Sequence, residues 1–368
     1  MRYAIAASAI LGAVAAAPQL INIEAALSVP TPTVLGPKVE ETKPAAISYN
    51  PTVVASAVAS LVKEEGVIEK RDASSCGPEL PGGVGVVPGD GSTGAYLAQD
   101  SILRQVARSA GPVPGYQQSF TDLTASSQQV GYLTYKNLNT YSPADCAAFC
   151  DSEKYCQGFN IYFERDPKFE PKDGCANPEA VTNIKCSIYG YNVAKKAATN
   201  DGQWRGPQDV KGEAFHVVIT GSNGYSKDGR DLPSVPDFNG GVALKATINA
   251  PLDNGYDTYN GMRLFNDNPY DPALCAAACK AQTEYDITHP ATDGSYKTCN
   301  FFTSYVLAKN DVPLGTYCAL YTRSWSEEYA VNTGYWYGDD QYTIRNAASY
   351  ALTFPKEPKK PVAQVAAP

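Results

Sequence analysis

The hydrophobic residues of the chain fall in short runs, and the order of these runs occurs twice. Two Ala-rich segments, 144–154 and 273–282, carry cysteines four positions apart, so both thiols of each segment lie on one face of a predicted helix. Ser142 and Asp271 precede these helices as suitable N-cap residues, each followed by a proline, which is favoured at the first helical position. Runs rich in apolar and β-branched residues predict strands at 158–163, 185–191, 213–221, 299–307 and 316–322. The pattern predicts an α+β fold in which one short helix packs on an antiparallel sheet, twice.

The two halves are copies of one unit. "NLNTYSPADCAAFC" at 137–150 aligns with "NDNPYDPALCAAAC" at 266–279, and "NDGQWRG" at 200–206 aligns with "NTGYWYG" at 332–338. Identities that persist at consistent offsets indicate an internal repeat. The predicted divisions are an N-terminal arm at 72–130, a first module at 131–227, a linker at 228–255, a second module at 256–354 and a Pro-rich tail at 355–368.

The N-terminal region has the pattern of a secreted precursor. Residues 1–17 combine Arg2, an apolar run and small residues before the predicted cleavage site, which is typical of a signal peptide. The apolar run is too short to span a membrane. Residues 18–71 contain a Pro/Thr-rich stretch and an amphipathic segment at 53–67. They end at the dibasic pair Lys70-Arg71, which predicts a removable propeptide and a mature chain that begins at Asp72.

The ten cysteines predict structural disulfides. Zinc favours C-x2-C pairs or nearby histidines, but the two histidines, His216 and His289, are not near a cysteine pair, and the C-x3-C spacing differs from that of C-x2-C redox centres. An even number of cysteines in a secreted chain favours disulfides. If each copy closes on itself, the remaining pair is Cys76–Cys175. Nested pairing then predicts Cys146–Cys186, Cys150–Cys156, Cys275–Cys318 and Cys279–Cys299.

A helix with C-x3-C, followed by "CQGFNIYF" at 156–163, resembles the PAN/Apple domain family. With "GFNIYFERDP" at 158–167, "ITGSNGYSK" at 219–227 and "INAP" at 248–251, the mature chain resembles secreted, Kex-processed fungal proteins with two such modules. The resemblance implies binding of proteins or carbohydrates without catalysis. A 14-residue insertion in the second copy departs from the compact pattern and implies an altered binding face there.

Composition and motifs provide little support for other functions. The formal net charge of −8 disfavours nucleic acids and anionic membranes as partners. No G-x-S-x-G motif accompanies the two histidines, so a serine triad has no support. Glu164 and Asp166 share a strand face, but their surroundings predict a solvated strand end. The Gly-rich stretch 82–91 lacks the context of a phosphate loop, and we interpret it as a flexible arm. We therefore predict no enzyme activity, no cofactor and no metal site.

Aromatic residues provide the candidate binding site. Trp204 and Trp336 occupy equivalent positions, which predicts that each packs in a module core. Trp325 has no counterpart, and Tyr335 and Tyr337 flank Trp336, so alternation along a strand directs them to the opposite face. We predict that Trp325, Tyr335 and Tyr337 bind the ligand, together with the insertion at 280–298. The alternative is that these aromatic residues only cover the sheet.

The sequence thus predicts a secreted, non-catalytic protein that binds extracellular carbohydrate or protein, with the cell wall as a candidate location. A structural or host-interacting secreted protein without glycan specificity is the alternative, and a cell-wall hydrolase is the third hypothesis.

Overall fold

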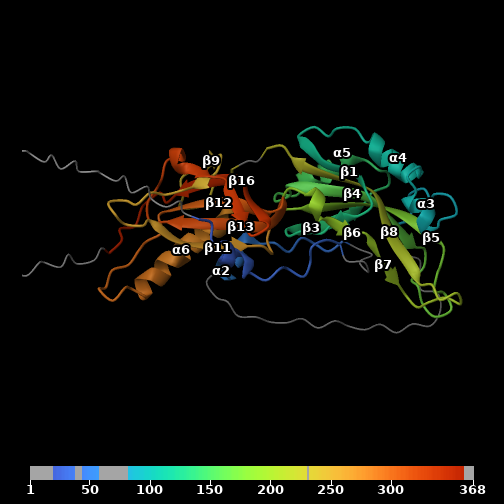
Figure 1. Ribbon diagram of the computed structural model, residues 1–368, viewed down its shortest axis with the longest axis horizontal. Coiled ribbons are helices and arrows are strands. Elements are labelled where there is room, and N and C mark those ends of the chain that lie inside the picture. Colours follow the sequence, from blue (N-terminus) through green and yellow to red (C-terminus); the bar gives the residue numbers. More distant parts are fainter. Residues whose placement is uncertain (1–19, 38–43, 58–81, 230–231, 360–368) are drawn as a thin grey trace, which may run out of the picture.

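The computed structural model describes residues 20–37, 44–57, 82–229 and 232–359. Figure 1 shows two β-sheets placed one after the other along the long axis of the molecule. The predicted signal peptide, the dibasic pair Lys70-Arg71 and Cys76 lie outside the described residues.

The first sheet has six strands in the order β1-β8-β4-β5-β3, with β7 paired to β8, and all pairs are antiparallel. Its strands are β1 (Tyr116–Leu123), β3 (Tyr132–Asn137), β4 (Gly158–Pro167), β5 (Ala180–Tyr189), β7 (Gly202–Arg205) and β8 (Phe215–Lys227). The short strands β2 (Ser126–Ser127) and β6 (Ala198–Asn200) pair separately. The helices are α3 (Thr93–Leu97), α4 (Ile102–Ser109), α5 (Pro143–Ser152) and the 3₁₀ turn η1 (Lys195–Ala197).

The second sheet repeats this topology. Its order is β11-β13-β12-β16-β15, with β9 paired to β16, and its pairs are also antiparallel. Its strands are β9 (Val242–Leu244), β11 (Tyr259–Phe265), β12 (Phe301–Lys309), β13 (Val312–Tyr321), β15 (Gly334–Tyr337) and β16 (Asp340–Ala351). The remaining elements are β10 (Thr247–Ile248) paired with β14 (Ala330–Asn332), helix α6 (Pro272–Thr288) and the turn η2 (Glu327–Tyr329). The α+β class and the antiparallel sheets predicted from the sequence are confirmed.

Each of the two equivalent helices begins at the predicted cap and is fastened to its sheet by disulfides. The Ser142 side chain accepts a hydrogen bond from the backbone amide of Asp145 at the start of α5. The Asp271 side chain accepts one from the backbone amide of Ala273 at the start of α6. The four disulfides in the described residues are Cys146–Cys186, Cys150–Cys156, Cys275–Cys318 and Cys279–Cys299. These are the nested pairs that the repeat predicts. Cys175 is also disulfide-bonded.

Helix α6 is longer than the sequence predicted. It continues through the first part of the 280–298 insertion to Thr288. Gln282 donates a hydrogen bond to Asp286 one turn later, and such i,i+4 contacts stabilise an added helical turn. His289 is the C-cap residue of α6, and its ring stacks on Tyr285.

The first core lies between one face of the first sheet and helices α3, α4 and α5. Phe159, Ile161 and Phe163 alternate along β4 toward these helices and are buried. The interpretation of 82–91 as a flexible arm was wrong, because this stretch packs on the sheet. The amide of Gly83 donates to the Asn183 side chain, and Gly85 forms an antiparallel bridge with Thr182.

The second sheet is covered on both faces. On one face, α6 packs together with Val235 and Phe238, which belong to the predicted linker 228–255. The opposite face carries several fully buried tyrosines, and helix α1 (Ile23–Leu27), from the predicted propeptide, packs on them. The buried tyrosines of this face are Tyr305, Tyr317, Tyr321 and Tyr342.

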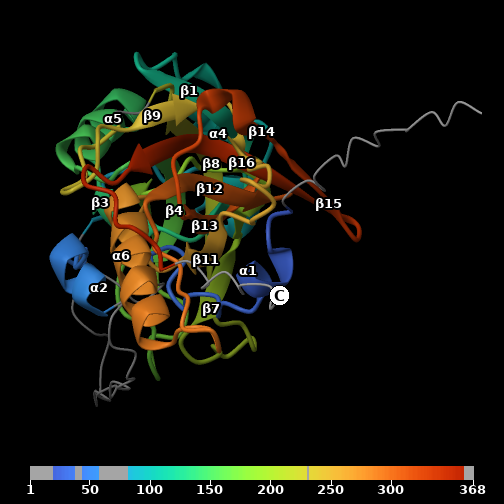
Figure 2. The same cartoon turned by 90° about the vertical axis from the view of Figure 1, so that its left-hand side faces the viewer.

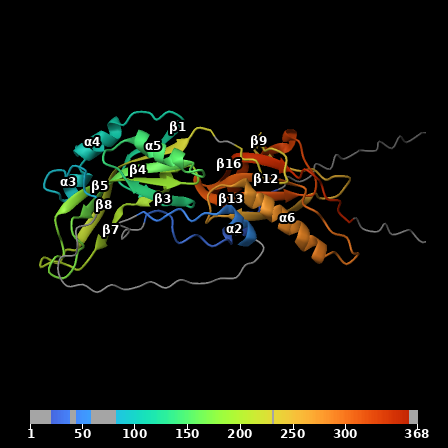
Figure 3. The same ribbon diagram turned by 180° about the vertical axis from the view of Figure 1, so that it is seen from behind.

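The N-terminal segment, defined here as the described residues 20–37 and 44–57, contacts both repeats. Figure 3 shows it running beneath both sheets, with helix α2 (Pro51–Ala57) beside α6. The amide of Gln129 donates to the carbonyl of Leu35, and the hydroxyl of Thr134 donates to the carbonyl of Ala45. Tyr49 donates to the carboxylate of Asp271, the α6 cap residue. The segment predicted to be removed is therefore packed into the folded chain.

The two repeats also contact each other directly through Tyr191. This residue is 1 % exposed and its hydroxyl lies 2.8 Å from the carbonyl oxygen of Asn268 and 3.0 Å from the hydroxyl of Thr316. Its ring packs with Tyr270 and Val306 of the second repeat. Because a Cβ on the adjacent Gly190 would lie 2.2 Å from the Cβ of Pro269, only glycine permits this close approach.

Candidate binding surfaces

The strand β15 directs its side chains alternately to two surfaces. Tyr335 and Tyr337 lie on one side, toward the N-terminal segment, and Trp336 lies on the other, toward solvent. The hydroxyl of Tyr335 donates to the carbonyl of Ile21, and that of Tyr337 donates to the Glu24 carboxylate at 3.2 Å. Burial raises the pKa of Tyr335, and the negative charge of Glu24 raises the pKa of Tyr337, so both phenols are neutral hydrogen-bond donors near neutral pH.

The N-terminal segment is seated deeply on this side. Ile21, Ile23 and Ala26 are 4 %, 2 % and 3 % exposed. The amide of Asn22 donates to the hydroxyl of Tyr317 at 3.1 Å, while its side chain caps α1. The structure therefore packs Tyr335 against a piece of the same chain, whereas Tyr337 touches that piece through its hydroxyl and remains 42 % exposed, as the sequence predicted.

The expectation that Trp204 and Trp336 pack in the module cores was wrong. They are 63 % and 64 % exposed on equivalent hairpins, β7–β8 and β15–β16. Figure 2 shows β15 reaching outward from the body of the molecule. Strand alternation established that Trp336 and its neighbouring tyrosines face opposite ways, but it could not determine which of the two sides is buried.

The rest of the repeated N-x-G-x-W motif has a structural explanation. The Asn200 and Asn332 side chains accept the amides of Gly202 and Gly334. Both glycines have positive φ, and a Cβ on Gly202 or Gly334 would lie 2.0 or 2.1 Å from a carbonyl oxygen of the neighbouring strand. Only glycine fits there. The asparagine and the glycine of the motif shape the turn. The tryptophan of the motif is exposed in both copies and packs in neither core.

The tryptophans differ in their surroundings. Trp204 stacks on His216 of the paired strand, with ring centroids 4.1 Å apart, and burial followed by the nearby Arg165 lowers the pKa of His216. Trp325 is partly buried: its indole N–H donates to the Thr258 hydroxyl, and its ring meets Tyr329 edge-on.

Glu164 and Asp166 do not form a solvated strand end. They lie in the first sheet at 5 % exposure each, and Glu164 accepts a hydrogen bond from the ammonium group of Lys185, which is 4 % exposed. Asp166 accepts a hydrogen bond from the Asn183 side chain. Burial and then Asp166 raise the pKa of Glu164 to about 8, against the effect of Lys185. Burial lowers the pKa of Lys185, but the neighbouring acidic residues Glu164 and Asp166 outweigh this effect and keep the lysine charged.

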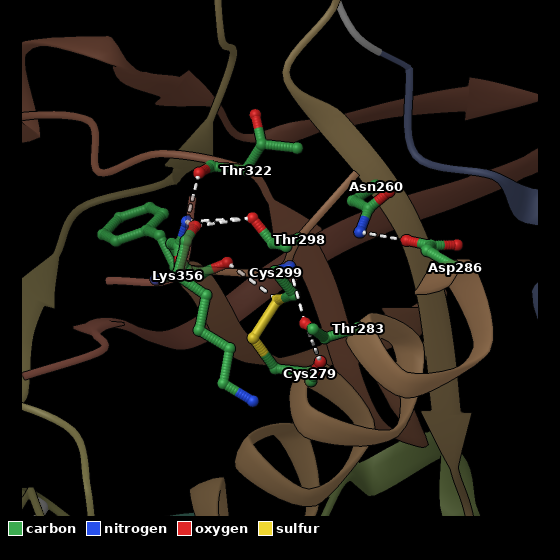
Figure 4. The surroundings of a disulfide bond; sticks show 10 residues. Asn260, Cys279, Thr283, Asp286, Thr298, Cys299, Thr322 and Lys356 are labelled. Carbon is green, nitrogen blue, oxygen red and sulfur yellow. Dashed lines mark hydrogen bonds between the residues drawn. A yellow bond between two sulfur atoms is a disulfide. The ribbon is translucent and has the colours of Figure 1, made fainter. Parts of the chain in front are cut away.

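The 280–298 insertion borders a shallow cleft of about 330 Å³ beside the Cys279–Cys299 disulfide. Figure 4 shows the hydrogen bonds beside this disulfide. The Thr283 hydroxyl donates a hydrogen bond to the Cys279 carbonyl and accepts one from the Cys299 amide. The Thr298 hydroxyl donates to the Lys356 carbonyl and so holds the following tail. The insertion residues labelled in Figure 4, Thr283, Asp286 and Thr298, thus form hydrogen bonds within the protein.

Within the described residues, no three His, Cys, Asp or Glu side chains are grouped as metal ligands. Across the same ranges, none of the helices has the length and hydrophobicity needed to cross a bilayer. No family model, no curated protein and no solved structure gives a significant match to the chain.

Proposed function

We propose that the chain is a secreted, non-catalytic binding protein that recognises extracellular carbohydrate or protein through two PAN/Apple-like modules. The observation that supports this most directly is the pair of exposed tryptophans, Trp204 and Trp336, on equivalent hairpins. A tryptophan that is retained in both copies without packing in a core is best explained by contact with something outside the chain.

The chemistry of an exposed indole suits both ligand classes. Its flat face stacks on sugar rings or on a protein surface with little loss of conformational entropy. Two such sites on one chain act together on a polymer, and linked sites raise the apparent affinity by about 100-fold or more when both engage. A polymeric ligand, such as a cell-wall polysaccharide, would use both hairpins.

Secretion is supported by the leader-like sequence at 1–17 and by the disulfides, which persist in oxidising compartments. A cell-wall hydrolase has less support. The carboxylates Glu164 and Asp166 are buried beside Lys185, and a glycosidase needs its carboxylates on either side of a bound sugar.

The test is retention on insoluble chitin, glucan and cellulose, with release of soluble sugar measured in parallel. We expect retention without sugar release, an affinity loss of about tenfold for Trp204→Ala or Trp336→Ala, and a larger loss for the double variant. Tyr256→Ala, which removes a 68 % exposed tyrosine outside the hairpins, is the matched control.

The other outcomes are equally informative. Loss of retention in Trp325→Ala alone would move the site to Trp325, the residue predicted from the sequence. No retention on any polymer would contradict carbohydrate binding and favour a protein ligand. Release of soluble sugar would contradict the non-catalytic function.

A further inference from the structure

We propose that the tyrosine face of the second sheet, defined as Tyr317, Tyr335 and Tyr337, is a peptide-binding site that residues 20–28 occupy in cis. This surface lies on the side of β15 opposite Trp336, so the proposal does not depend on the exposed tryptophans.

The contacts are those with which proteins recognise a polypeptide. The Tyr335 hydroxyl donates to the backbone carbonyl of Ile21, and the Tyr317 hydroxyl accepts the backbone amide of Asn22. The site therefore binds a backbone carbonyl and a backbone amide of two consecutive residues, Ile21 and Asn22. Between them the side chains of Ile21 and Ile23 enter the apolar surface and are almost completely buried. Backbone hydrogen bonds with pockets for selected side chains are typical of peptide recognition.

The tyrosine face is specific to the second repeat. In the first repeat the positions equivalent to Tyr317, Tyr335 and Tyr337 hold Lys185, Gln203 and Arg205. The repeated residues form the fold in both copies, so residues that occur in one copy alone are not required by the shared fold. In the first repeat, moreover, Lys185 is engaged in a buried hydrogen bond with Glu164. The peptide site is thus a feature added to one copy of a common scaffold.

The bound segment has the features of a ligand rather than of a sheet component. Residues 20–37 contribute no strand to either sheet in the part of the chain that the structure describes, and they reach the tyrosine face through side chains and one short helix. Their removal would leave every strand pair of the second sheet intact. It would also uncover the rings of Tyr317 and Tyr335 and create an apolar surface.

The chemistry of the site defines its partner. The site accepts a short polypeptide with two aliphatic residues separated by one position, a small residue three positions later and an acidic residue for Tyr337. In this chain these are Ile21, Ile23, Ala26 and Glu24. A tethered segment has an effective concentration of about 1 mM, so a peptide in solution competes poorly while the cis segment is bound.

The test uses the full chain and a fluorescent synthetic peptide of residues 20–37, with binding followed by anisotropy. In the Ile23→Asp chain, a carboxylate enters the apolar pocket and weakens the cis contact. We expect the peptide to bind this variant at least tenfold more tightly than the wild-type chain, whose site is occupied. Leu27→Asp, at a 46 % exposed position of the same helix, is the matched control and should behave as wild type.

Further variants distinguish a loss of peptide binding from a loss of folding. Tyr335→Phe with Tyr337→Phe, introduced into the Ile23→Asp chain, removes two hydroxyls and should weaken peptide binding about tenfold or more. Asn22→Pro, compatible with the observed φ of −76°, removes the amide that Tyr317 accepts and serves as an independent way to free the site if Ile23→Asp does not fold. Equal peptide binding to wild type and Ile23→Asp, or none to either freed chain with native-like circular dichroism, would overturn the proposal.

Discussion

Glu164 is a buried acid whose protonation couples stability to pH. Its pKa is raised to about 8 by burial and by Asp166, whereas an unfolded glutamate titrates near 4.3. Between these values the folded chain holds a proton that the unfolded chain has lost, so the contribution of Glu164 to the unfolding free energy is full below about pH 4 and falls as the pH rises to 8.

We therefore predict that Glu164→Gln removes this part of the pH dependence. Glutamine resembles the protonated acid, so the difference in unfolding free energy between wild type and variant should change by up to about 1.4 kcal/mol per pH unit between pH 5 and 8. Urea unfolding at several pH values measures it, and the subtraction cancels other titrating groups. Parallel curves across this range would show that Glu164 ionises normally in the folded chain.

Some residues were predictable and others were not, for identifiable reasons. The half-cystines and the caps Ser142 and Asp271 follow from short local patterns. The partial burial of Tyr335 depends on Ile21, which is more than 300 residues away in the sequence, and nothing local to β15 indicates that contact. Glu164 likewise lies in a polar stretch whose burial arises from tertiary packing.

At the level of elements, the two equivalent helices test whether a cap does more than begin a helix. Ser142 caps α5, whereas Asp271 caps α6 and also accepts the hydroxyl of Tyr49 from the N-terminal segment. Ser142→Ala should cost about 1 kcal/mol of unfolding free energy, and Asp271→Ala should cost more because the Tyr49 hydroxyl also loses its partner. Denaturant unfolding measures both, and Tyr49→Phe isolates the second contact. Equal losses at the two caps would mean that the Tyr49 contact contributes nothing.

The predicted elements agree with the structure where the local pattern is sufficient. Helices α5 and α6 begin where their caps indicate, and the C-x3-C spacing directs both thiols at the sheet. The last turns of α6 were missed because the Ala-rich run ends at Gln282, although Pro290, two residues beyond Thr288, is a typical signal for the observed end. The packing of 82–91 was missed because glycines carry no pattern that predicts a contact, although Gly85 pairs with Thr182.

At the level of the whole molecule, the repeats form one connected structure. Tyr191 of the first repeat is buried among residues of the second, and the N-terminal segment contacts both. Internal repeats are stabilised by the interfaces with their neighbours as well as by their own cores. The sequence therefore predicted a short helix on an antiparallel sheet in each repeat, but it gave no information on the strand order or on how the repeats are joined.

The final prediction concerns that junction. Tyr191→Phe keeps the ring but leaves the Asn268 carbonyl without its donor, which should cost about 1–3 kcal/mol, whereas Tyr191→Ala also opens a cavity and should cost about 3–5 kcal/mol. Because the lost contacts lie between the repeats, we expect calorimetry to show one unfolding transition for wild type and for Tyr191→Phe, at a lower temperature in the variant, and two separate transitions for Tyr191→Ala. Tyr256→Ala, at an exposed tyrosine, should leave the wild-type transition unchanged. A single, unshifted transition in Tyr191→Ala would show that this contact does not couple the two repeats, and the N-terminal segment would then be the element that joins them.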